Sequence, residues 1–395
     1  RVTANKYVAT NSWRSAAADI RCHEAAVLMA GGYPTTKLEK EYSDQTLQAA
    51  HDLYKGRIGL QQLVRNLAIQ GGYVGDPEVR ANLRPMLQAA FSTADIGGIL
   101  SNIANKFLLE GYTHVDQAWK QIAAIRNVPD FKTVTSYRML AGTKFAKIGP
   151  TGEIGHGDLA EQAYTNKADT YGRMMTITRQ DIINDDLGAL SAVPTQIGRG
   201  AGLKLSEVFW SEFLAEHTSG RTLFPTDKSK KNYIDGATDS AVGVTGLSKA
   251  VETFRAQTDP NGDLLGLTPR IWLVPIKYET LAMQVMASTE VREKGTGDKV
   301  YATANPFANR FLVVSSPYLS DQRMGGAYST EAWYLLADPN ELPFIEVAFL
   351  NGTQQPTVEQ ADADFNVLGI QMRGYFDFGV KTQDHRAAVK AKNAA

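Results

Sequence analysis

The chain has 395 residues, and its 41 Lys and Arg nearly balance its 42 Asp and Glu, giving a formal net charge of −1. This balance excludes the overall positive charge of a dedicated nucleic-acid-binding protein, although a local basic face is compatible with it. Hydrophobic residues make up 43% of the chain, which is enough for a sizeable core and excludes a disordered protein.

Cysteine usage and hydropathy exclude further classes of protein. The single cysteine, Cys22, rules out an internal disulfide framework and a zinc site built on several thiolates. Apolar runs such as residues 271–274 are strand-length and fall short of the ~18 residues that span a membrane. The chain starts without an initiator methionine and without an apolar signal segment. We therefore expect that the chain has no secretory signal. We also expect that residues before Arg1 were removed, either by a host protease or in the design of the expressed protein.

Residues 1–75 are predicted to form an arm of short helices. Apolar residues recur at helical spacing around residues 20–28, 47–54 and 60–68, and glycine-rich turns separate these segments. Helices this short are marginal on their own in water, so we expect them to lie on another surface.

Residues 76–130 are predicted to be mainly helix and connector. One helix is expected to start at residues 93–96 and to carry Ile99, Ile103 and Phe107 on one side. A second helix is expected over residues 115–125.

A long two-stranded ribbon is predicted over residues 131–180. Residues 131–138 have the β-branched and aromatic content of a strand, and residues 162–177 are expected to form its return strand. The intervening residues 141–160 contain five glycines and few large apolar side chains. A ribbon without a hydrophobic face is marginally stable, so we expect its supporting surface to come from outside its own domain, most simply from a neighbouring copy.

Residues 185–217 follow as one long helical pattern. At 1.5 Å per residue, this helix would span roughly 50 Å, which is longer than a compact domain and typical of a spine. Pro194 is expected to kink it, and Gly198, Gly200 and Gly202 are expected to loosen it.

Residues 240–340 alternate between helix and strand, which indicates a small α/β domain. Helices are expected around residues 247–254 and 278–286, and strands over residues 270–274 and 311–314.

The C-terminal part returns to strand. Residues 344–350 are almost wholly apolar, and apolar residues alternate with a period of two over residues 370–380. Asn351-Gly352 is a strong turn signal after the first of these strands.

No catalytic or metal-binding constellation emerges from the sequence. None of the six histidines pairs with another at metal-ligand spacing. His23 is interpreted as a solvated or partly packed helix residue, and Cys22 as a small helix residue. Gly246 to Ser248 falls one glycine short of a nucleophile elbow, so Thr245 or Ser248 is expected to cap a helix instead. We therefore predict no catalytic, cofactor or metal site.

The order of these elements resembles that of the major capsid proteins of tailed bacteriophages, in particular the Mu-like and prohead protease–capsid fusion branch. The resemblance covers about residues 90–390. Three segments carry it, namely residues 91–96 (Phe-Ser-Thr-Ala-Asp-Ile), residues 176–187 (Thr-Ile-Thr-Arg-Gln followed by Ile-Asn-Asp-Asp-Leu), and residues 374–380 (Gly-Tyr-Phe-Asp-Phe-Gly-Val) with 384–386 (Asp-His-Arg).

This resemblance implies an α+β, HK-ninety-seven-like phage capsid fold. Its expected parts are an N-terminal arm (1–90), a helical connector (91–130), the extended E-loop hairpin (131–180), the P domain with its spine helix (181–239), the A domain (240–340), and the P-domain strands with the C-terminus (341–395).

The implied function is structural rather than enzymatic. Copies would form the pentamers and hexamers of an icosahedral shell around double-stranded DNA, which they would contact non-specifically. Portal and head-completion proteins are implied partners, with scaffold or decoration proteins as further ones and no membrane. The implied location is the virion, assembled in the bacterial cytoplasm. An encapsulin-like nanocompartment shell and a soluble two-domain α/β enzyme are the alternatives.

Some capsids of this fold link an E-loop lysine covalently to a neighbour's asparagine. Lys144, Lys147 and Lys167 are loop lysines here, and Asn351 is a candidate asparagine. The matching acid cannot be assigned, so solvated surface lysines are the preferred interpretation.

Overall fold

The structure is a computed structural model. It describes residues 20–70, 73–74, 85–86, 95–139, 161–178, 180, 183–184, 188–215, 222–259, 262–294, 300–361 and 369–392. The chain divides into two compact units. Unit 1 consists of residues 1–115, 170–203 and 354–376, and unit 2 of residues 116–169, 204–353 and 377–395. The six-part division drawn from the capsid resemblance stays a prediction.

Unit 1 is mainly helical. Its elements are α2 (Ile20–Ala30), α3 (Thr35–Glu41), α4 (Asp44–Tyr54), α5 (Leu60–Gln70), α7 (Asp95–Thr113) and β12 (Thr357–Ala361). Three elements contribute residues to both units, namely β4 (Asp169–Thr178), α10 (Gly188–Phe213) and β13 (Gly369–Thr382).

Unit 2 is mixed. It contains α8 (Trp119–Ile122), β1 (Ala124–Val128), β2 (Val134–Met139), β3 (Glu161–Asn166), β5 (Tyr233–Ile234), α11 (Val244–Arg255), β6 (Pro269–Pro275), α12 (Ile276–Ala287), β7 (Glu290–Lys294), β8 (Val300–Ala304), β9 (Leu312–Ser316), β10 (Ala332–Ala337), β11 (Ile345–Leu350), β14 (Ala388–Lys392) and three short 3-10 helices (Pro317–Ser320, Gln322–Met324 and His385–Ala387). The predicted α+β fold class is confirmed.

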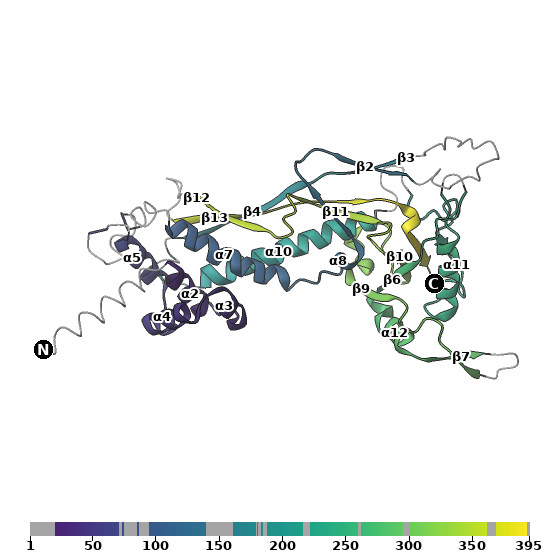
Figure 1. Ribbon diagram of the computed structural model, residues 1–395, viewed down its shortest axis with the longest axis horizontal. Coiled ribbons are helices and arrows are strands. Elements are labelled where there is room, and N and C mark those ends of the chain that lie inside the picture. Colours follow the sequence, from purple (N-terminus) through teal and green to yellow (C-terminus); the bar gives the residue numbers. More distant parts are fainter. Residues whose placement is uncertain are drawn as a thin grey trace, which may run out of the picture. The chain divides into compact units, whose positions relative to one another are not determined.

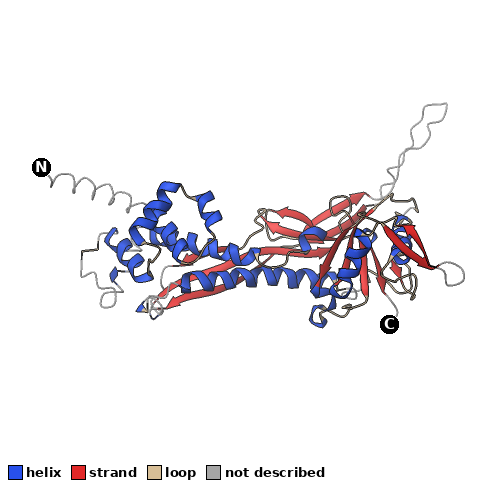
Figure 2. Ribbon diagram, turned by 90° about the horizontal axis from the view of Figure 1, so that it is seen from below, coloured by secondary structure: helices blue, strands red, loops and turns tan. Residues whose placement is uncertain are grey.

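The predicted short helices near the N-terminus are confirmed, and they support one another. Figures 1 and 2 show α2 to α5 gathered in one cluster close to α7. Leu28 of α2, Leu63 of α5 and Ile103 of α7 are buried in a single hydrophobic core. Ser43 caps α4, because its hydroxyl accepts a hydrogen bond from the Thr46 N–H at 3.3 Å. The surface on which these helices lie is therefore the core of their own unit.

Glycines let α7 and the first part of α10 approach each other very closely. A Cβ atom at Gly198 would lie 1.8 Å from the carbonyl oxygen of Leu108, and one at Gly111 would lie 1.9 Å from that of Thr195. Gly200 has no neighbour within 4 Å of such an atom. The missing side chain of Gly198 makes room for the backbone of α7, so this glycine serves close packing, and loosening of the helix by the three glycines stays a prediction.

The long helix is confirmed over Gly188–Phe213, with Pro194 inside it. Its predicted start at residues 185–187 lies outside the described residues. Its predicted end at residue 217 is wrong, since Leu214 and Ala215 are no longer helical. Leu214 is buried, and its carbonyl lies close to Gly325. The backbone of Gly325 has a φ of 139°, a conformation that glycine adopts readily.

A five-stranded sheet with the order β5-β14-β10-β6-β9 forms the centre of unit 2. Helix α11 packs on β14 and β10, and α12 packs on β6 and β9. The interior is aromatic, with Trp272 and Trp333 in edge-to-face contact at 5.9 Å between ring centroids. The predicted elements α11, β6, α12 and β9 are confirmed, whereas β10 and β14 were not anticipated.

The other main sheet of unit 2 contains β1, β11 and the second part of β13. Strand β1 runs parallel to β11, with Ala124 opposite Glu346 and Val128 opposite Leu350. The predicted helix over residues 115–125 is therefore wrong in extent. Only the four residues of α8 are helical, because the chain then pairs with β11.

The predicted ribbon is present at its base, but its return strand is two strands. Strands β2 and β3 pair antiparallel from Val134 opposite Asn166 to Met139 opposite Glu161. After β3 the chain becomes β4, which pairs with β13. The break falls at Lys167, whose carbonyl oxygen would lie 1.8 Å from a Cβ atom at Gly379. The predicted tip, residues 141–160, lies outside the described residues.

A second two-stranded ribbon, β7–β8, was not predicted. It pairs antiparallel from Glu290 opposite Ala304 to Lys294 opposite Val300. The predicted turn after β11 is confirmed, with left-handed φ values of 52° at Asn351 and 72° at Gly352.

Candidate assembly surfaces

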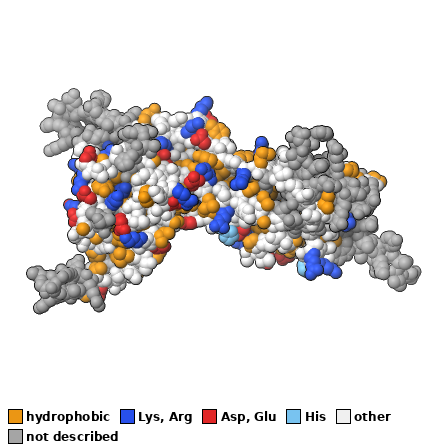
Figure 3. Space-filling model, turned by 180° about the vertical axis from the view of Figure 1, so that it is seen from behind, with side chains coloured by type: hydrophobic (Ala, Val, Ile, Leu, Met, Phe, Trp, Pro, Cys, Tyr) orange, Lys and Arg blue, Asp and Glu red, His pale blue; other side chains and the backbone are white. Residues whose placement is uncertain are grey.

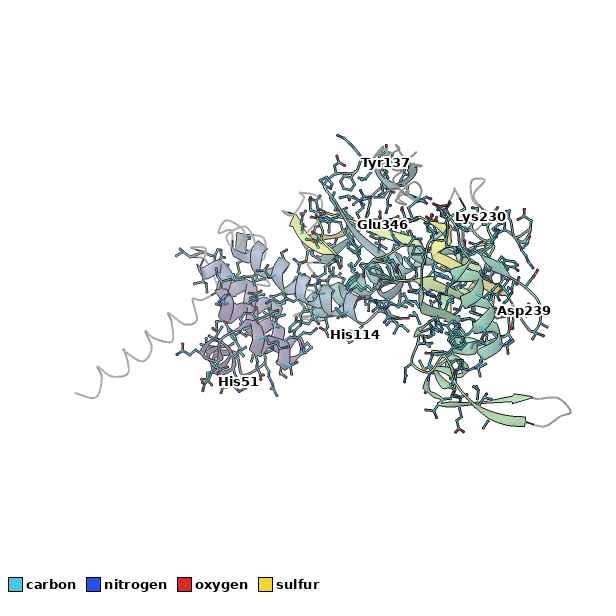
Figure 4. All side chains as sticks on the ribbon, turned by 45° about the vertical axis from the view of Figure 1, so that its right-hand side comes forward. His51, His114, Tyr137, Lys230, Asp239 and Glu346 are labelled. Carbon is cyan, nitrogen blue, oxygen red and sulfur yellow. The ribbon has the colours of Figure 1, made fainter. Side chains whose placement is uncertain are left out.

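The structure gives no sign of a catalytic centre in the part of the chain that it describes. Neither a group of residues suited to hold a metal ion nor a helix long and apolar enough to cross a membrane occurs among these residues. His23 is 1% exposed and its ring lies 5.8 Å from that of Tyr54, so of the two interpretations the solvated one is wrong and His23 is a packed helix residue. Cys22 is equally buried. His51 and His114 lie well apart on unit 1 (Figure 4).

Residues Gly246 to Ser248, which fall one glycine short of a nucleophile elbow, lie inside α11, which begins at Val244. The expected cap by Thr245 or Ser248 is wrong, since Gly243 occupies the capping position and the Ser248 hydroxyl donates to the Val244 carbonyl within the helix at 2.8 Å. Two of the cross-link candidates, Lys144 and Lys147, and two of the histidines, His156 and His217, lie outside the residues whose side chains the structure describes.

Unit 1 contains a cavity of about 380 Å³ between α7, α10 and the turn after α2. Tyr33 and Phe107 line it together with Glu110. The Glu110 carboxylate is already paired with the Lys37 ammonium, and it lies 3.2 Å from Nε2 of His114. The lining also carries the hydroxyls of Ser191 and Thr195, but the Thr195 hydroxyl donates to the Ser191 carbonyl at 2.7 Å and Glu110 is held by Lys37, so the described lining does not present a hydroxyl assembled with a base as a nucleophile.

Charged side chains are dispersed over the described surface. On the face shown in Figure 3, basic and acidic side chains are interspersed rather than gathered by sign. Ion pairs between exposed side chains of the described residues include Lys204 with Glu207 at 3.1 Å and Arg373 with Glu359 at 2.7 Å. This mixture matches the net charge of −1 and lets like surfaces pack densely without strong repulsion.

The base of the β2–β3 ribbon is held by a polar cluster within unit 2, in which two side chains are buried and two are half-buried. Glu346 on β11 is 7% exposed, and its Oε1 accepts a hydrogen bond from Nδ2 of Asn166 at 3.1 Å. Its Oε2 lies 3.8 Å from Nη1 of Arg126, which also donates to the Ser136 hydroxyl. We call these four residues, Arg126, Ser136, Asn166 and Glu346, the ribbon clamp.

Apolar residues next to the ribbon clamp complete this contact. Val128, Ala168 and Ala348 form a small buried cluster, and Val134 packs against it. The expectation that the ribbon takes its whole support from a neighbouring copy is therefore wrong for its base, which its own subunit covers.

The outer side of the same ribbon is exposed. Tyr137 on β2 has 66% of its surface accessible, and Phe131 just before the strand is also exposed. Figure 4 labels Tyr137 on the ribbon and Glu346 at its base. Beyond β2 and β3 themselves, no described strand joins this sheet. The ribbon thus presents an aromatic side chain and two strand edges for contact.

The base of the β7–β8 ribbon is held by one amide side chain. Asn305 donates from Nδ2 to the carbonyls of Val285 at 2.6 Å and Ser288 at 3.0 Å. Its Oδ1 accepts from the Phe307 N–H at 2.9 Å. The β-branched and aromatic content of residues 300–304 was the sequence signal that could have revealed this ribbon.

Two of the cross-link candidates are described. Lys167 is exposed at the end of β3, with Nζ 3.2 Å from a carboxylate oxygen of Asp169. Asn351 is exposed in its turn, and its N–H donates to the Val128 carbonyl at 2.8 Å. Both residues are exposed, as expected of solvated surface side chains, and we do not predict a covalent link between them.

No curated protein matches the sequence significantly. Among solved structures, the capsid of the cyanophage P-SCSP1u is 14% identical with a TM-score of 0.48, and the match covers 70% of this chain and 88% of that one. The virus-like particle from Pyrococcus furiosus is 7% identical with a TM-score of 0.44, covering 74% and 98%. The procapsid of bacteriophage JBD30 is 14% identical with a TM-score of 0.37, covering 77% of each chain.

The sequence profile of one family, described as phage capsid protein, matches residues 162–391. This range runs from β3 through the central sheet of unit 2 to β14. It covers more than half of the chain and confirms the predicted capsid function. The chain belongs to the phage capsid protein family.

Proposed function

We propose that this major capsid protein assembles into pentamers and hexamers, which close into an icosahedral shell around double-stranded DNA. The exposed β2–β3 ribbon carries the proposal. It has a fixed base on its own subunit and an accessible outer side with Tyr137. A ribbon of this kind gains most stability when its free edge and aromatic side chain lie on another copy.

Many modest contacts of this type would add up to a tight shell. Each neighbour in a closed shell is held at high effective concentration by the others, so no single interface has to be strong. The interspersed surface charges fit dense packing of identical copies. Contact with DNA would be through scattered Lys and Arg to phosphates, without base reading.

The remaining parts of the proposal follow from the capsid resemblance. The shell would be part of the virion and assemble in the bacterial cytoplasm. It would receive portal and head-completion proteins, with scaffold or decoration proteins as further partners. The Mu-like or protease–capsid fusion branch stays a prediction. The subunit would act as a structural protein and not as an enzyme, without a cofactor.

Electron microscopy and light scattering of the purified full chain test the proposal. We expect particles with pentameric and hexameric clusters. A species that stays a small oligomer at all concentrations and salt conditions contradicts it and favours the soluble α/β enzyme. The nucleic acid content of shells assembled in the native host separates a phage capsid from an encapsulin-like nanocompartment, which would enclose protein.

A further inference from the structure

We infer that Glu346 is a positioning residue for assembly, because the ribbon clamp sets the register and direction of the β2–β3 ribbon before the subunit meets a neighbour. This inference rests on the proposed shell function. It explains why the ribbon of a single copy already has the direction in which it would contact a neighbour.

Glu346 joins three elements of unit 2 to its own strand. It projects from β11 and contacts Arg126 of β1 at 3.8 Å and Asn166 of β3 at 3.1 Å. Arg126 in turn donates to Ser136 of β2. One carboxylate therefore ties both strands of the ribbon to the β1–β11 pair.

The amide of Asn166 is held in the orientation that this contact requires. Its Oδ1 accepts a hydrogen bond from the Lys167 N–H at 2.9 Å, which leaves Nδ2 directed at Glu346. Asn166 itself is 3% exposed. The interaction is thus made away from water, where a hydrogen bond to a charged group is stronger than at the surface.

Burial makes this cluster selective for one arrangement. A carboxylate taken out of water is costly unless its partners are in place, so conformations that separate Glu346 from the buried Asn166 are disfavoured, and the half-buried Arg126 adds a weaker contact at 3.8 Å. A shift of the ribbon by one residue would turn Asn166 and Ser136 to the opposite face of their strands. The exposed outer side of the hairpin does little to fix its register. The ribbon clamp therefore excludes the neighbouring registers.

The steric fit beside the ribbon clamp acts in the same direction. Ala348, two residues after Glu346 on the same face of β11, packs with Ala168 just beyond β3. Gly379 of β13 admits the Lys167 carbonyl at a distance that no side chain would permit. With its base fixed at three points, the ribbon loses less conformational freedom when it docks on another copy.

Hydrogen exchange on unassembled full-length subunits tests the inference directly. We compare the wild type with Glu346→Gln, which keeps an acceptor for Asn166 but removes the charge that faces Arg126. Ser136→Ala removes only the hydroxyl that Arg126 contacts, so it tests the ribbon clamp with little risk to folding. Glu359→Gln is the matched control, since Glu359 is a strand carboxylate paired with Arg373 at 2.7 Å in an exposed position.

We expect amide exchange in residues 134–139 and 161–166 to become about tenfold faster in Glu346→Gln and a few-fold faster in Ser136→Ala. The concentration needed for shell assembly should rise by about the same factors. Glu359→Gln should leave both readouts unchanged. Exchange in these strands that stays within about twofold of the wild type in both clamp variants overturns the inference. A wild type that forms no shells contradicts the proposed function instead, and the exchange comparison then still decides the role of Glu346.

Discussion

The α7–α10 crossing in unit 1 and the base of the ribbon in unit 2 both use a glycine to bring two backbones together, yet they are held in different ways. At the crossing, Gly198 faces the Leu108 carbonyl, and the surroundings are apolar. At the ribbon base, Gly379 faces the Lys167 carbonyl, and the buried Glu346 cluster is added. Two long helices bury enough apolar surface for shape alone to fix them, whereas a two-stranded ribbon needs directional polar contacts.

The largest effect is expected for Gly198→Ala at the helix crossing. Its new methyl group would overlap the Leu108 carbonyl, which cannot move without the whole of α7. We expect a loss of about 3 kcal/mol in the free energy of unfolding, measured by urea denaturation.

Gly200→Ala is the control for this prediction, because it lies in the same helix turn with open space around it. It should be neutral or stabilising by up to about 1 kcal/mol, since alanine favours the helix. Equal losses in the two variants would show that general helix flexibility, not the close approach, is what the glycines provide.

A smaller effect is expected for Gly379→Ala at the ribbon base. The methyl group would meet the Lys167 carbonyl, but the strand there ends and can shift locally. We expect a loss of about 2 kcal/mol in the free energy of unfolding and faster amide exchange in β2 and β3. Gly326→Ala, which has open space and no positive φ, should change neither quantity. A ribbon that exchanges normally in Gly379→Ala would show that the polar cluster alone holds the base.

An exposed ion pair should contribute less than the buried one and should depend on pH and salt. Hydrogen bonds from Arg373 and from the Tyr375 hydroxyl lower the pKa of the Glu359 carboxyl. The stabilisation is therefore present above the pKa of the unfolded chain and is lost as pH falls through the lowered folded-state pKa.

We expect a small difference in unfolding midpoint between the wild type and Glu359→Gln at neutral pH. This difference should shrink toward zero on acidification below the ordinary carboxyl range and at about 1 M salt. The midpoint difference caused by Ser136→Ala should persist at high salt, because this variant removes a neutral hydroxyl and leaves both charges of the ribbon clamp in place. If the Glu359→Gln difference persisted at high salt and the Ser136→Ala difference disappeared, the expected contrast between the exposed ion pair and the ribbon clamp would be contradicted.

The smallest effect on the isolated subunit is expected for Tyr137→Ser. The side chain is exposed on the ribbon, so the free energy of unfolding should change by less than about 0.5 kcal/mol. Assembly should nevertheless weaken about tenfold if the aromatic ring is buried against another copy, as light scattering at graded concentrations would detect. Unchanged assembly would move the contact surface elsewhere on the subunit.

Much of the fold could be predicted from local patterns. The period-two alternation of β13 and the helical spacing in α7, α11 and α12 lie in segments long enough to identify their type. The capsid family could be proposed from the order of elements, and its match begins at residue 162 within the ribbon. The Asn351-Gly352 turn was evident because few dipeptides adopt two left-handed conformations in succession.

The rest depends on contacts between distant residues. Residues 124 and 125 read as the end of a helix until β11 is present to pair with β1. Gly198 suggests flexibility until Leu108 is placed against it. Glu346 gave no signal at all in the sequence, because its partners Arg126 and Asn166 are each about 200 residues away along the chain. Such tertiary effects override local propensity, and the assembly surfaces consist largely of them.

The burial of Cys22 has a practical consequence for spectroscopy. It is the only cysteine in the chain, and at 1% exposure its sulfur reacts slowly with thiol reagents. A cysteine introduced at Tyr137 would therefore take up a fluorophore or spin label selectively, without prior removal of the native thiol. The label would report the moment at which the ribbon of one subunit becomes covered during particle formation.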